Sequence, residues 1–227
     1  MEKVIQLRNV TKTYAIDGDR VNALNGLDLD IKKGEFIAIM GPSGSGKSTA
    51  MNMVGSLDTP TNGQVILDGH DIAKLDESQL TEIRGKRIGF VFQTFNLIPS
   101  LTALENVMLP MAFQRVSKDL RYKKGVETLN LVGLGNRLNH KPNQLSGGQK
   151  QRVAVARALV NDPEVILADE PTGNLDSKSG QEIMGLLQDL NVKHNKTIIL
   201  VTHDANIAKR ADRIINLKDG KIVKGKK

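Results

Sequence analysis

The sequence predicts an α/β fold in which a mainly parallel sheet is covered by helices. Three short, continuously apolar runs have the length of strands that are buried on both faces: FIAIM (36–40), VILA (165–168) and TIILV (197–201). Segments with apolar residues at helical spacing separate these runs. Such alternation is typical of strand–helix–strand units, which build parallel sheets.

The composition is that of a folded domain. The chain has 227 residues, of which 39% are hydrophobic, and this suits one large domain or a core with one inserted subdomain. No apolar run approaches the roughly 20 residues needed to span a bilayer. The N-terminus alternates in hydropathy and lacks the apolar centre of a secretory signal. We therefore expect a soluble, cytoplasmic protein.

Charge, aromatic content and cysteine content exclude some kinds of binding site. The net charge of +7 is shared by proteins that bind nucleic acid, ATP or an anionic membrane face. Only 3% of the residues are aromatic, too few for a base-stacking platform, so we expect no nucleic-acid partner. The chain has no cysteine, which excludes disulfides and cysteine-based metal sites. His70, His140 and His194 show no metal-ligand spacing.

The first ninety residues read mainly as strands. Residues 4–10 and 24–31 alternate like exposed antiparallel strands, and the buried run 36–40 follows them. A helix is expected to begin near Lys47. Residues 64–69 and 88–92 are the next strand candidates.

From residue 93 to about residue 142 the pattern becomes helical. Thr102 and Glu105 have the spacing of a capping box that opens one helix. A second helix is expected from about Ser117 to about Gly133. We interpret this region as a helical subdomain inserted into the α/β core.

The α/β pattern resumes after Pro163. A helix with Ile183, Leu186, Leu187 and Leu190 on one face follows the strand at 165–168. After the strand at 197–201 we expect a short helix following His203 and a hairpin through Asp219 and Gly220. The predicted division is a core of residues 1–92 and 163–227 and a helical subdomain of residues 93–162.

GPSGSGKST fits the phosphate-loop pattern G-x-x-x-x-G-K-[ST], and it lies between a predicted strand and helix as that motif requires. Its glycines allow backbone N–H groups to wrap phosphates, and the helix N-terminus adds its dipole. Lys47 is predicted to reach the β- and γ-phosphates, and the Ser48 hydroxyl to hold Mg²⁺. The candidate nucleotide-binding residues of this loop are Gly41, Pro42, Ser43, Gly44, Ser45, Gly46, Lys47, Ser48 and Thr49.

LSGGQ (145–149) has two interpretations. Ser146 and Gln149 have the spacing of a capping box for the following helix. Capping leaves Gly147 and Gly148 unexplained, because glycine in a first helical turn costs up to about 1 kcal/mol relative to alanine. Two glycines indicate a close approach to the bare backbone, and a γ-phosphate at the helix N-terminus would be such a ligand. From these residues alone, capping and ligand binding both remain open.

VILADEP (165–171) places two carboxylates after a buried strand. Asp169 and Glu170 stand at the carboxyl end of that strand, where open α/β sheets bind their ligands. Asp169 would orient Mg²⁺ through a water, and Glu170 would polarise the attacking water as general base. An acidic pair without a catalytic role is the alternative. His203 ends another apolar strand, although a lone histidine is usually structural.

Together, these three motifs resemble the ATPase subunit of an ABC transporter, and the resemblance runs nearly end to end. It implies a P-loop NTPase core of the RecA-like type with an antiparallel β-subdomain and an inserted α-helical subdomain. It further implies ATPase activity with ATP and Mg²⁺. Each ATP would be sandwiched between the phosphate loop of one protomer and LSGGQ of the other, in a homodimer of the ATP-bound state.

The resemblance also assigns residues. It implies that Glu170, His203 and Lys47 are catalytic, with His203 as the switch histidine at the γ-phosphate. Tyr14 matches the adenine-stacking aromatic, although by itself it would be an ordinary surface tyrosine. Asp176 matches the loop that crosses the dimer interface. The implied metal ligands are Ser48, Gln93 and Asp169. The implied nucleotide-binding residues beyond the phosphate loop are Tyr14, Gln93, Ser146, Gly147, Gly148, Gln149 and Asp176.

Two longer segments resemble the lipoprotein-releasing and macrolide-exporting type of ABC ATPase: residues 90–110 and 167–177. Lys150 departs from the family, where glutamine is commoner. Residues 95–110 are apolar enough to form a groove for a coupling helix of an integral membrane permease, or simply the subdomain core. The resemblance places the chain on the cytoplasmic, inner face of the cell membrane.

Other classes remain. A division-associated complex that signals across the membrane would share these motifs. Soluble ABC ATPases of translation or DNA repair usually join two cassettes or carry long coiled coils, and neither feature is present. A phosphate-loop kinase or GTPase would not explain LSGGQ or His203. The sequence does not identify the transported substrate.

Overall fold

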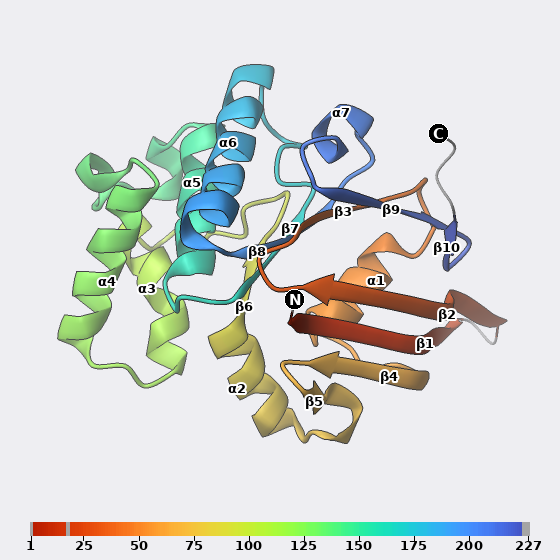
Figure 1. Cartoon of the computed structure of the whole chain (residues 1–227). Helices are drawn as coiled ribbons and strands as arrows, with labels where there is room; N and C mark the ends of the chain where they lie inside the picture. Colours follow the sequence, from red (N-terminus) through yellow and green to blue (C-terminus); the bar gives the residue numbers. More distant parts are fainter. Residues whose placement is uncertain (1, 17–18, 224–227) are drawn as a thin grey trace. The chain divides into compact units, whose positions relative to one another are not determined.

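The computed structural model describes residues 2–16 and 19–223. These residues form two compact units, which Figure 1 shows within the whole chain. Unit 1 takes in the chain up to Thr81 and from Thr197 onward, and unit 2 is Glu82–Lys196. The division into a core and a 93–162 subdomain stays a prediction.

Unit 1 contains an antiparallel sheet. Its strands are β1 (Lys3–Ile16), β2 (Asp19–Lys32), β4 (Asn62–Leu67) and β5 (His70–Asp71), in the order β2-β1-β4-β5. Every neighbouring pair is antiparallel. The predicted alternation is confirmed, because Leu27, Leu29 and Ile31 of β2 are buried while the residues between them are not. Asp17 and Gly18, which stand three and four residues after Tyr14, lie outside the described residues.

A second group of strands in unit 1 carries the continuous apolar runs. β3 (Phe36–Met40) lies parallel to both β8 (Thr197–Val201) and β9 (Arg213–Lys218), and β10 (Lys221–Val223) pairs antiparallel with β9. α1 (Lys47–Val54) begins where predicted, and α7 (Ala205–Ala208) follows His203. Asp219 and Gly220 have φ of +50° and +72°, the left-handed pair that a tight two-residue hairpin requires.

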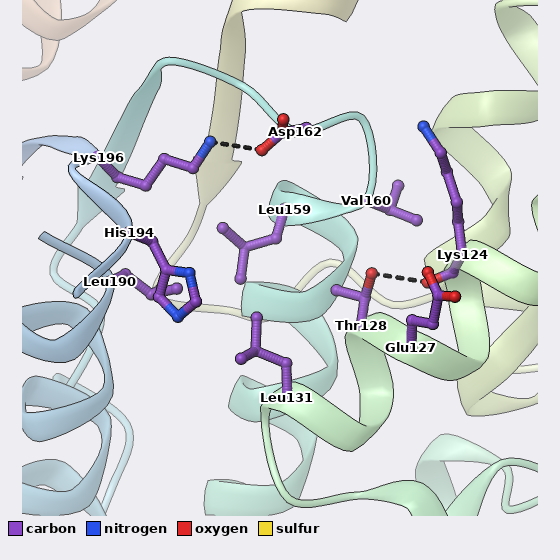
Figure 2. A pocket seen from close by; sticks show the side chains of 10 residues that line it. All are labelled: Lys124, Glu127, Thr128, Leu131, Leu159, Val160, Asp162, Leu190, His194 and Lys196. Carbon is purple, nitrogen blue, oxygen red and sulfur yellow. Dashed lines mark hydrogen bonds and ion pairs between the residues drawn. The ribbon is translucent and has the colours of Figure 1, made fainter.

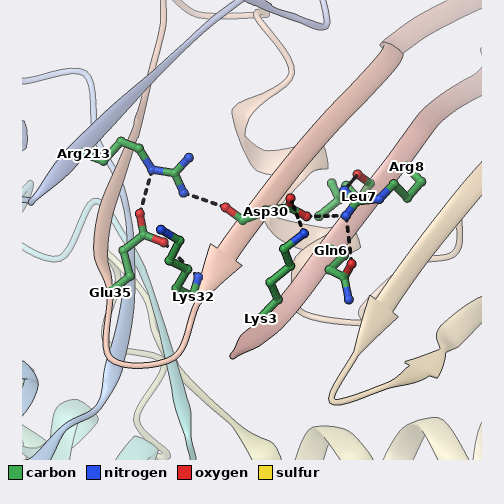
Figure 3. Close-up of polar contacts among 8 residues, drawn as sticks. All are labelled: Lys3, Gln6, Leu7, Arg8, Asp30, Lys32, Glu35 and Arg213. Carbon is green, nitrogen blue, oxygen red and sulfur yellow. Dashed lines mark hydrogen bonds and ion pairs between the residues drawn. The ribbon is translucent and has the colours of Figure 1, made fainter. Parts of the chain in front are cut away.

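A charged network joins the two groups of strands inside unit 1 (Figure 3). Arg213 of β9 donates to Glu35 (2.7 Å) and to the Asp30 carbonyl of β2 (2.6 Å). The Asp30 carboxylate pairs with Lys3 (2.9 Å) and Arg8 (2.6 Å) of β1. Burial raises the pKa of Asp30, but the two cations outweigh it and hold the pKa below its ordinary value.

Unit 2 is built around one parallel strand pair and a set of helices. β6 (Ile88–Val91) pairs in parallel with β7 (Val165–Asp169). α3, α4 and α5 pack against one another, and α5 also packs on β6 and α6, as the green and blue helices of Figure 1 show. The helices are α3 (Ala103–Phe113), α4 (Lys118–Leu131), α5 (Gly147–Leu159) and α6 (Ser177–His194), with short 3₁₀ turns at Gly135–Arg137 and Pro142–Gln144.

Local signals predicted these helices well. Thr102 and Glu105 form the expected capping box of α3, and α4 lies within the predicted limits. One helix was missed: α2 (Glu77–Arg87), whose mostly polar sequence buries only Leu80 and so lacks an apolar stripe. A further 3₁₀ turn, Ile72–Lys74, precedes it. No helix of the described residues is long and apolar enough to cross a membrane.

The predicted helix after β7 is confirmed, and its buried face differs from the apolar spacing at one position. Leu186 of α6 is only half-buried, whereas Met184 is fully buried. The buried residues Ile183, Met184, Leu187 and Leu190 follow the spacing i, i+1, i+4, i+7. The buried stripe is therefore rotated toward Met184, and Leu186 lies at its edge.

Candidate functional site

The phosphate loop (residues 41–49) connects β3 to α1 in unit 1. Its main chain closes on itself, with the Ser45 N–H donating to the Pro42 carbonyl at 3.2 Å. Lys47 Nζ donates to the carbonyls of Gly41 (2.8 Å) and Pro42 (2.7 Å). The ammonium therefore lies over the loop, next to the main chain that is predicted to wrap phosphates.

Main-chain neighbours support this loop. Gly46 has a φ of +97°, and a Cβ there would lie 2.4 Å from the Ala23 carbonyl of β2. The Gly220 N–H donates to the Ser45 carbonyl (3.1 Å), and the Gly220 carbonyl accepts from the Asn25 N–H (2.9 Å). The hairpin turn and β2 thus hold the loop in place. Sequence reasoning predicted the turn but not this contact.

The rest of the loop offers oxygen and N–H groups. Pro42, Ser43, Gly44 and Ser48 are exposed, while Ser45 is buried. The Ser48 hydroxyl lies in the first turn of α1, where the helix N-terminus favours anions. A hydroxyl is also a hard oxygen ligand of the kind that Mg²⁺ prefers. This donor set fits a magnesium nucleotide.

Tyr14 of β1 is held by two residues that sequence reasoning missed. Its hydroxyl donates to Asp58 at 2.9 Å. Lys12 Nζ lies 5.1 Å from the ring centroid and pairs with Asp58 at 2.6 Å. Burial, together with the Asp58 carboxylate, raises the pKa of Tyr14, while a hydrogen bond with Thr49 of the phosphate loop opposes the shift. The ring is therefore held in a fixed orientation beside the loop.

His203 follows β8 at the edge of the sheet where the phosphate loop also begins. β3 and β8 are parallel neighbours with Ile39 opposite Val201, so their carboxyl ends meet at the same edge. His203 is exposed and follows the buried Thr202, whose hydroxyl accepts from the Asp204 N–H at 3.1 Å. Asp204 in turn caps α7.

In unit 2, Asp169 and Glu170 stand at the carboxyl end of β7 as predicted. Glu170 has a φ of +45°, a left-handed conformation that costs a non-glycine residue about 1–3 kcal/mol. A turn maintains it, with the Gly173 N–H donating to the Glu170 carbonyl at 3.0 Å. Nine other non-glycine residues of the described chain also have a positive φ, so Glu170 is a candidate because this conformation coincides with its place beside Asp169 at the end of β7.

Gln93 lies next to these carboxylates in the fold. β6 and β7 are parallel with Val91 opposite Ala168, so Gln93 and Asp169 leave the same edge of the strand pair. Asn174 donates to the Gln93 carbonyl (3.0 Å), and Gln93 Nε2 lies 3.5 Å from Asn174 Oδ1. The Gln93 amide oxygen and the Asp169 carboxylate suit Mg²⁺.

The signature segment (residues 145–149) forms the predicted cap. The Ser146 hydroxyl accepts from the Gln149 N–H (3.3 Å), and Gln149 Oε1 accepts from the Ser146 N–H (3.0 Å). Side chains of this protein also lie close to the two glycines. A Cβ on Gly147 would lie 3.3 Å from the Leu175 side chain, and one on Gly148 would lie 2.9 Å from Ser179 Oγ. The approaching group is this chain's own segment before and at the start of α6.

Asp176 caps α6, accepting from the Ser179 N–H at 2.9 Å. Hydrogen bonds from the Ser179 N–H and from the Ser179 side chain lower the pKa of Asp176. Because Leu175 and Ser179 lie against Gly147 and Gly148, the structure brings the segment around Asp176 and the signature segment together. A cavity of about 450 Å³ lies between the beginnings of α5 and α6. Its lining residues are Gly133, Leu134, Ser146, Gly148, Gln149, Arg152, Ser179 and Glu182.

A second cavity of unit 2, of about 300 Å³, lies between α4 and the ends of α5 and α6 (Figure 2). Leu159 and Leu190 are among its apolar lining residues, and the ion pair between Lys196 and Asp162 (2.6 Å) stands at its side. None of the predicted site residues lines it.

Comparisons with known proteins identify the family. Residues 24–173 match the family model described as "ABC transporter". The chain belongs to the ABC transporter ATP-binding family. It is 55% identical to the ABC transporter ATP-binding protein MJ0796 of Methanocaldococcus jannaschii, over 99% of this chain and 97% of that protein. A solved structure of the MJ0796 cassette, a dimer in a post-hydrolysis state with ADP and Pi, superposes with a TM-score of 0.89 at 54% identity and covers 98% of each chain.

This ABC cassette is also similar to a longer transporter. It is 50% identical to the macrolide export ATP-binding/permease protein MacB of Hyphomonas neptunium, over 97% of this chain but 34% of MacB. The chain therefore has the P-loop ABC fold and is an ATPase, like the rest of the family. The comparisons favour a transport ATPase over a soluble ATPase of translation or repair.

Proposed function

We propose that this ABC cassette drives an exporting or lipoprotein-releasing transporter and that Glu170 is its general base. The strained Glu170, at the carboxyl end of β7 beside Asp169 and close to Gln93, is the observation that carries the proposal. Its support is the 54% identity to a cassette solved with ADP and Pi.

The residues of unit 1 bind the nucleotide. Tyr14, held by Asp58, stacks on adenine, and the N–H groups of residues 41–49 wrap the phosphates. Lys47 moves its ammonium from the loop carbonyls to the β- and γ-phosphates. His203 contacts the γ-phosphate from the end of β8, which shares an edge with the loop.

The residues around β7 perform hydrolysis. Glu170 accepts the proton of the attacking water, and His203 holds that water in line. Ser48, Gln93 and Asp169 would hold Mg²⁺, which neutralises charge on the β- and γ-phosphates when bound. Charge stabilisation and positioning supply most of the acceleration in such reactions.

Two copies form the complete arrangement. MJ0796 is a dimer in its solved structures, and we infer the same two-fold dimer for this chain in the ATP-bound state. The signature residues Ser146, Gly147, Gly148 and Gln149 then bind the γ-phosphate held by the partner. Asp176 crosses the interface, which agrees with the contact of its neighbour Leu175 with Gly147 of the signature segment.

Residues 95–110 receive the membrane partner. The buried Asn106 donates to the carbonyls of Ile98 (3.2 Å) and Leu101 (3.1 Å), which fixes the loop on α3. Arg157 of α5 donates to the carbonyls of Phe95 (2.8 Å) and Asn96. The segment is thus tied to the helix that begins at the signature, as a coupling surface requires. The occupant is a coupling helix of an integral membrane permease, and the cassette is peripheral on the cytoplasmic face.

Glu170→Gln tests the chemical step. The variant keeps the side chain's size but cannot accept a proton, so kcat is expected to fall by about a hundredfold or more, with ATP affinity retained. In size-exclusion chromatography it accumulates as a dimer with ATP and Mg²⁺ and stays monomeric with ADP. Hydrolysis at the wild-type rate would show that Glu170 is not the base.

The same variant tests the partner. Tagged Glu170→Gln protein, held in ATP, is used to extract partners from solubilised membranes, with the ADP-bound protein as the control. Recovery of one multi-spanning membrane protein with ATP supports the transporter, and its extracytoplasmic part indicates the cargo. Recovery of soluble partners alone contradicts the transport assignment. A permease-like partner without any transported substrate indicates the division-signalling alternative.

A further inference from the structure

Gln151 is a polar side chain in the core of unit 2. It lies on α5, two residues after the signature segment, and it is fully buried (0% exposed). Ala154, Val155 and Ala158, which follow it at helical spacing on the same face, are buried as well. An amide at this position carries a desolvation cost unless its hydrogen bonds are satisfied.

The amide nitrogen is satisfied by two carbonyls. Gln151 Nε2 donates to the Pro171 carbonyl at 2.8 Å and to the Phe92 carbonyl at 3.3 Å. Pro171 directly follows Glu170, and Phe92 directly precedes Gln93. One side chain thus connects the main chain at the ends of β6 and β7, beside two predicted site residues.

The amide oxygen of Gln151 has a destabilising environment. Gln151 Oε1 is buried, and none of the described residues donates to it. A buried acceptor without a donor is destabilising, so stability alone does not explain a glutamine here. An apolar residue of the same size would avoid that cost but would lose both hydrogen bonds.

The bond to Pro171 acts on a strained segment. Glu170 is left-handed with a φ of +45°, and such strain persists only where neighbouring groups over-determine it. The Gly173 N–H holds the Glu170 carbonyl (3.0 Å). Gln151 holds the carbonyl of the next residue (2.8 Å). The peptide after Glu170 is therefore fixed at two successive carbonyls.

We infer that Gln151 is a positioning residue for hydrolysis: its amide holds the Phe92 and Pro171 carbonyls so that Gln93 and Glu170 keep their working orientation. The inference rests on the proposed role of Glu170. Gln151 itself does not touch nucleotide. It also connects the helix that begins at the signature with the general base.

Gln151→Met tests this role, because methionine matches glutamine in length and cannot donate. We expect kcat for ATP to fall by about tenfold to a hundredfold, the loss that a small misplacement of a catalytic group causes. The Kd for ATP is expected to stay within about threefold, since the phosphate loop is unchanged. Because a smaller folded fraction would also lower the apparent kcat at an unchanged Kd, kcat is calculated per ATP-binding site counted in the same titration.

Val153→Ala is the matched control. Val153 is fully buried on the same helix, and its truncation lowers the melting temperature by lost packing without removing a hydrogen bond. Its kcat is expected to stay within about twofold of wild type. An equal loss of kcat in Val153→Ala and Gln151→Met would overturn the positioning role, and so would wild-type kcat in Gln151→Met.

Gln151→Glu keeps the test informative if Gln151→Met fails to fold. A neutral carboxyl can donate to the Pro171 carbonyl, whereas a carboxylate cannot, and a buried Glu titrates near about pH 8. The kcat of Gln151→Glu relative to wild type should therefore rise as the pH falls from about 8 to about 6. A ratio that does not change with pH contradicts the inference. Glu170→Gln at full activity would instead overturn the proposed base, whatever the Gln151 variants show.

Discussion

The phosphate-loop region of unit 1 and the signature region of unit 2 are held by different means. Around the loop, main-chain groups hold main-chain groups: Gly220 bonds Ser45 and Asn25, and Ala23 lies against Gly46. In unit 2, side chains hold the main chain, as Gln151 does at Pro171. Asn174 does the same at Gln93 and Ser146 at Gln149.

This difference follows from what each region is proposed to do. N–H groups that wrap phosphates must be held in one backbone conformation. The close main-chain contacts of the loop glycines exclude other conformations of the loop. A base and a signature that engage only in the dimer are better placed by side chains, which can be adjusted one at a time. Substitutions in the loop should therefore abolish function, whereas those in unit 2 should reduce it by degrees.

Gly46→Ala should have the largest effect. A Cβ at residue 46 would lie 2.4 Å from the Ala23 carbonyl at a φ of +97°, so the loop must shift. We expect the Kd for ATP, measured by fluorescence titration, to rise by at least about a hundredfold, close to 3 kcal/mol.

Gly44→Ala is its matched control. Residue 44 has a φ of +75° but nothing within 4 Å of an added Cβ, so only the backbone cost of about 1–2 kcal/mol applies. Equal losses in Gly44→Ala and Gly46→Ala would mean that conformation, and not main-chain contact, constrains the loop.

Gly148→Ala tests whether α6 constrains the signature segment. The added Cβ would meet Ser179 at 2.9 Å, and Ser179→Gly would relieve that contact. In urea unfolding of the double-mutant cycle we expect a coupling energy of about 1 kcal/mol. Gly147→Ala, whose Cβ would meet the Leu175 side chain at 3.3 Å and the Asn174 carbonyl at 3.9 Å but not Ser179, should show little coupling with Ser179→Gly. Zero coupling for Gly148 would leave ligand binding as the sole reason for that glycine.

Ser146→Ala and Thr102→Ala compare two similar caps. Both hydroxyls accept from the third backbone N–H of their helix in a capping box, so each variant should lose about 1 kcal/mol of unfolding free energy. Only Ser146→Ala should also weaken ATP-induced dimers of the Glu170→Gln protein, seen by chromatography. If both variants dimerise alike, Ser146 caps its helix and does not bind nucleotide.

Asp58→Asn should have the smallest effect. Burial raises the pKa of Asp58, but hydrogen bonds from Lys12 and Tyr14 outweigh it and hold the pKa below 3.8. A depressed folded-state pKa adds stability above the unfolded pKa that is lost as the pH falls through the folded one. Wild type should therefore exceed Asp58→Asn by about 1 kcal/mol or less at pH 7. The difference should begin to shrink as the pH falls below about 4, the unfolded pKa, and should vanish only below the depressed folded-state pKa.

Glu82→Gln is the control for that acid-range effect. Glu82 pairs with Lys86 at 2.6 Å on the exposed face of α2, where solvent screens the pair. The difference in unfolding free energy between wild type and Glu82→Gln should therefore be the same at acid and at neutral pH. A pH-dependent difference as large as that of Asp58→Asn would mean that the Asp58 contacts stabilise the fold no more than an exposed ion pair does.

Local patterns explain why much of this protein could be predicted. The caps at Thr102 and Ser146, the start of α1 at Lys47 and the Asp219-Gly220 turn each depend on residues within about four positions of one another. The apolar runs determined the buried strands, because only a strand with helices on both faces tolerates such composition. α2 was missed because its polar sequence carries no such pattern.

Contacts between distant residues were decided by the tertiary structure alone. Tyr14 and Asp58 are 44 positions apart, and Gln151 lies 20 positions from Pro171 and 59 from Phe92. One signal for Gln151 was present: a glutamine on the apolar face of α5. Its partners depend on how β6, β7 and α5 pack, which no local pattern encodes. The sequence by itself determined the motifs and their elements, whereas packing decided which carbonyls, glycines and amides hold those motifs in place.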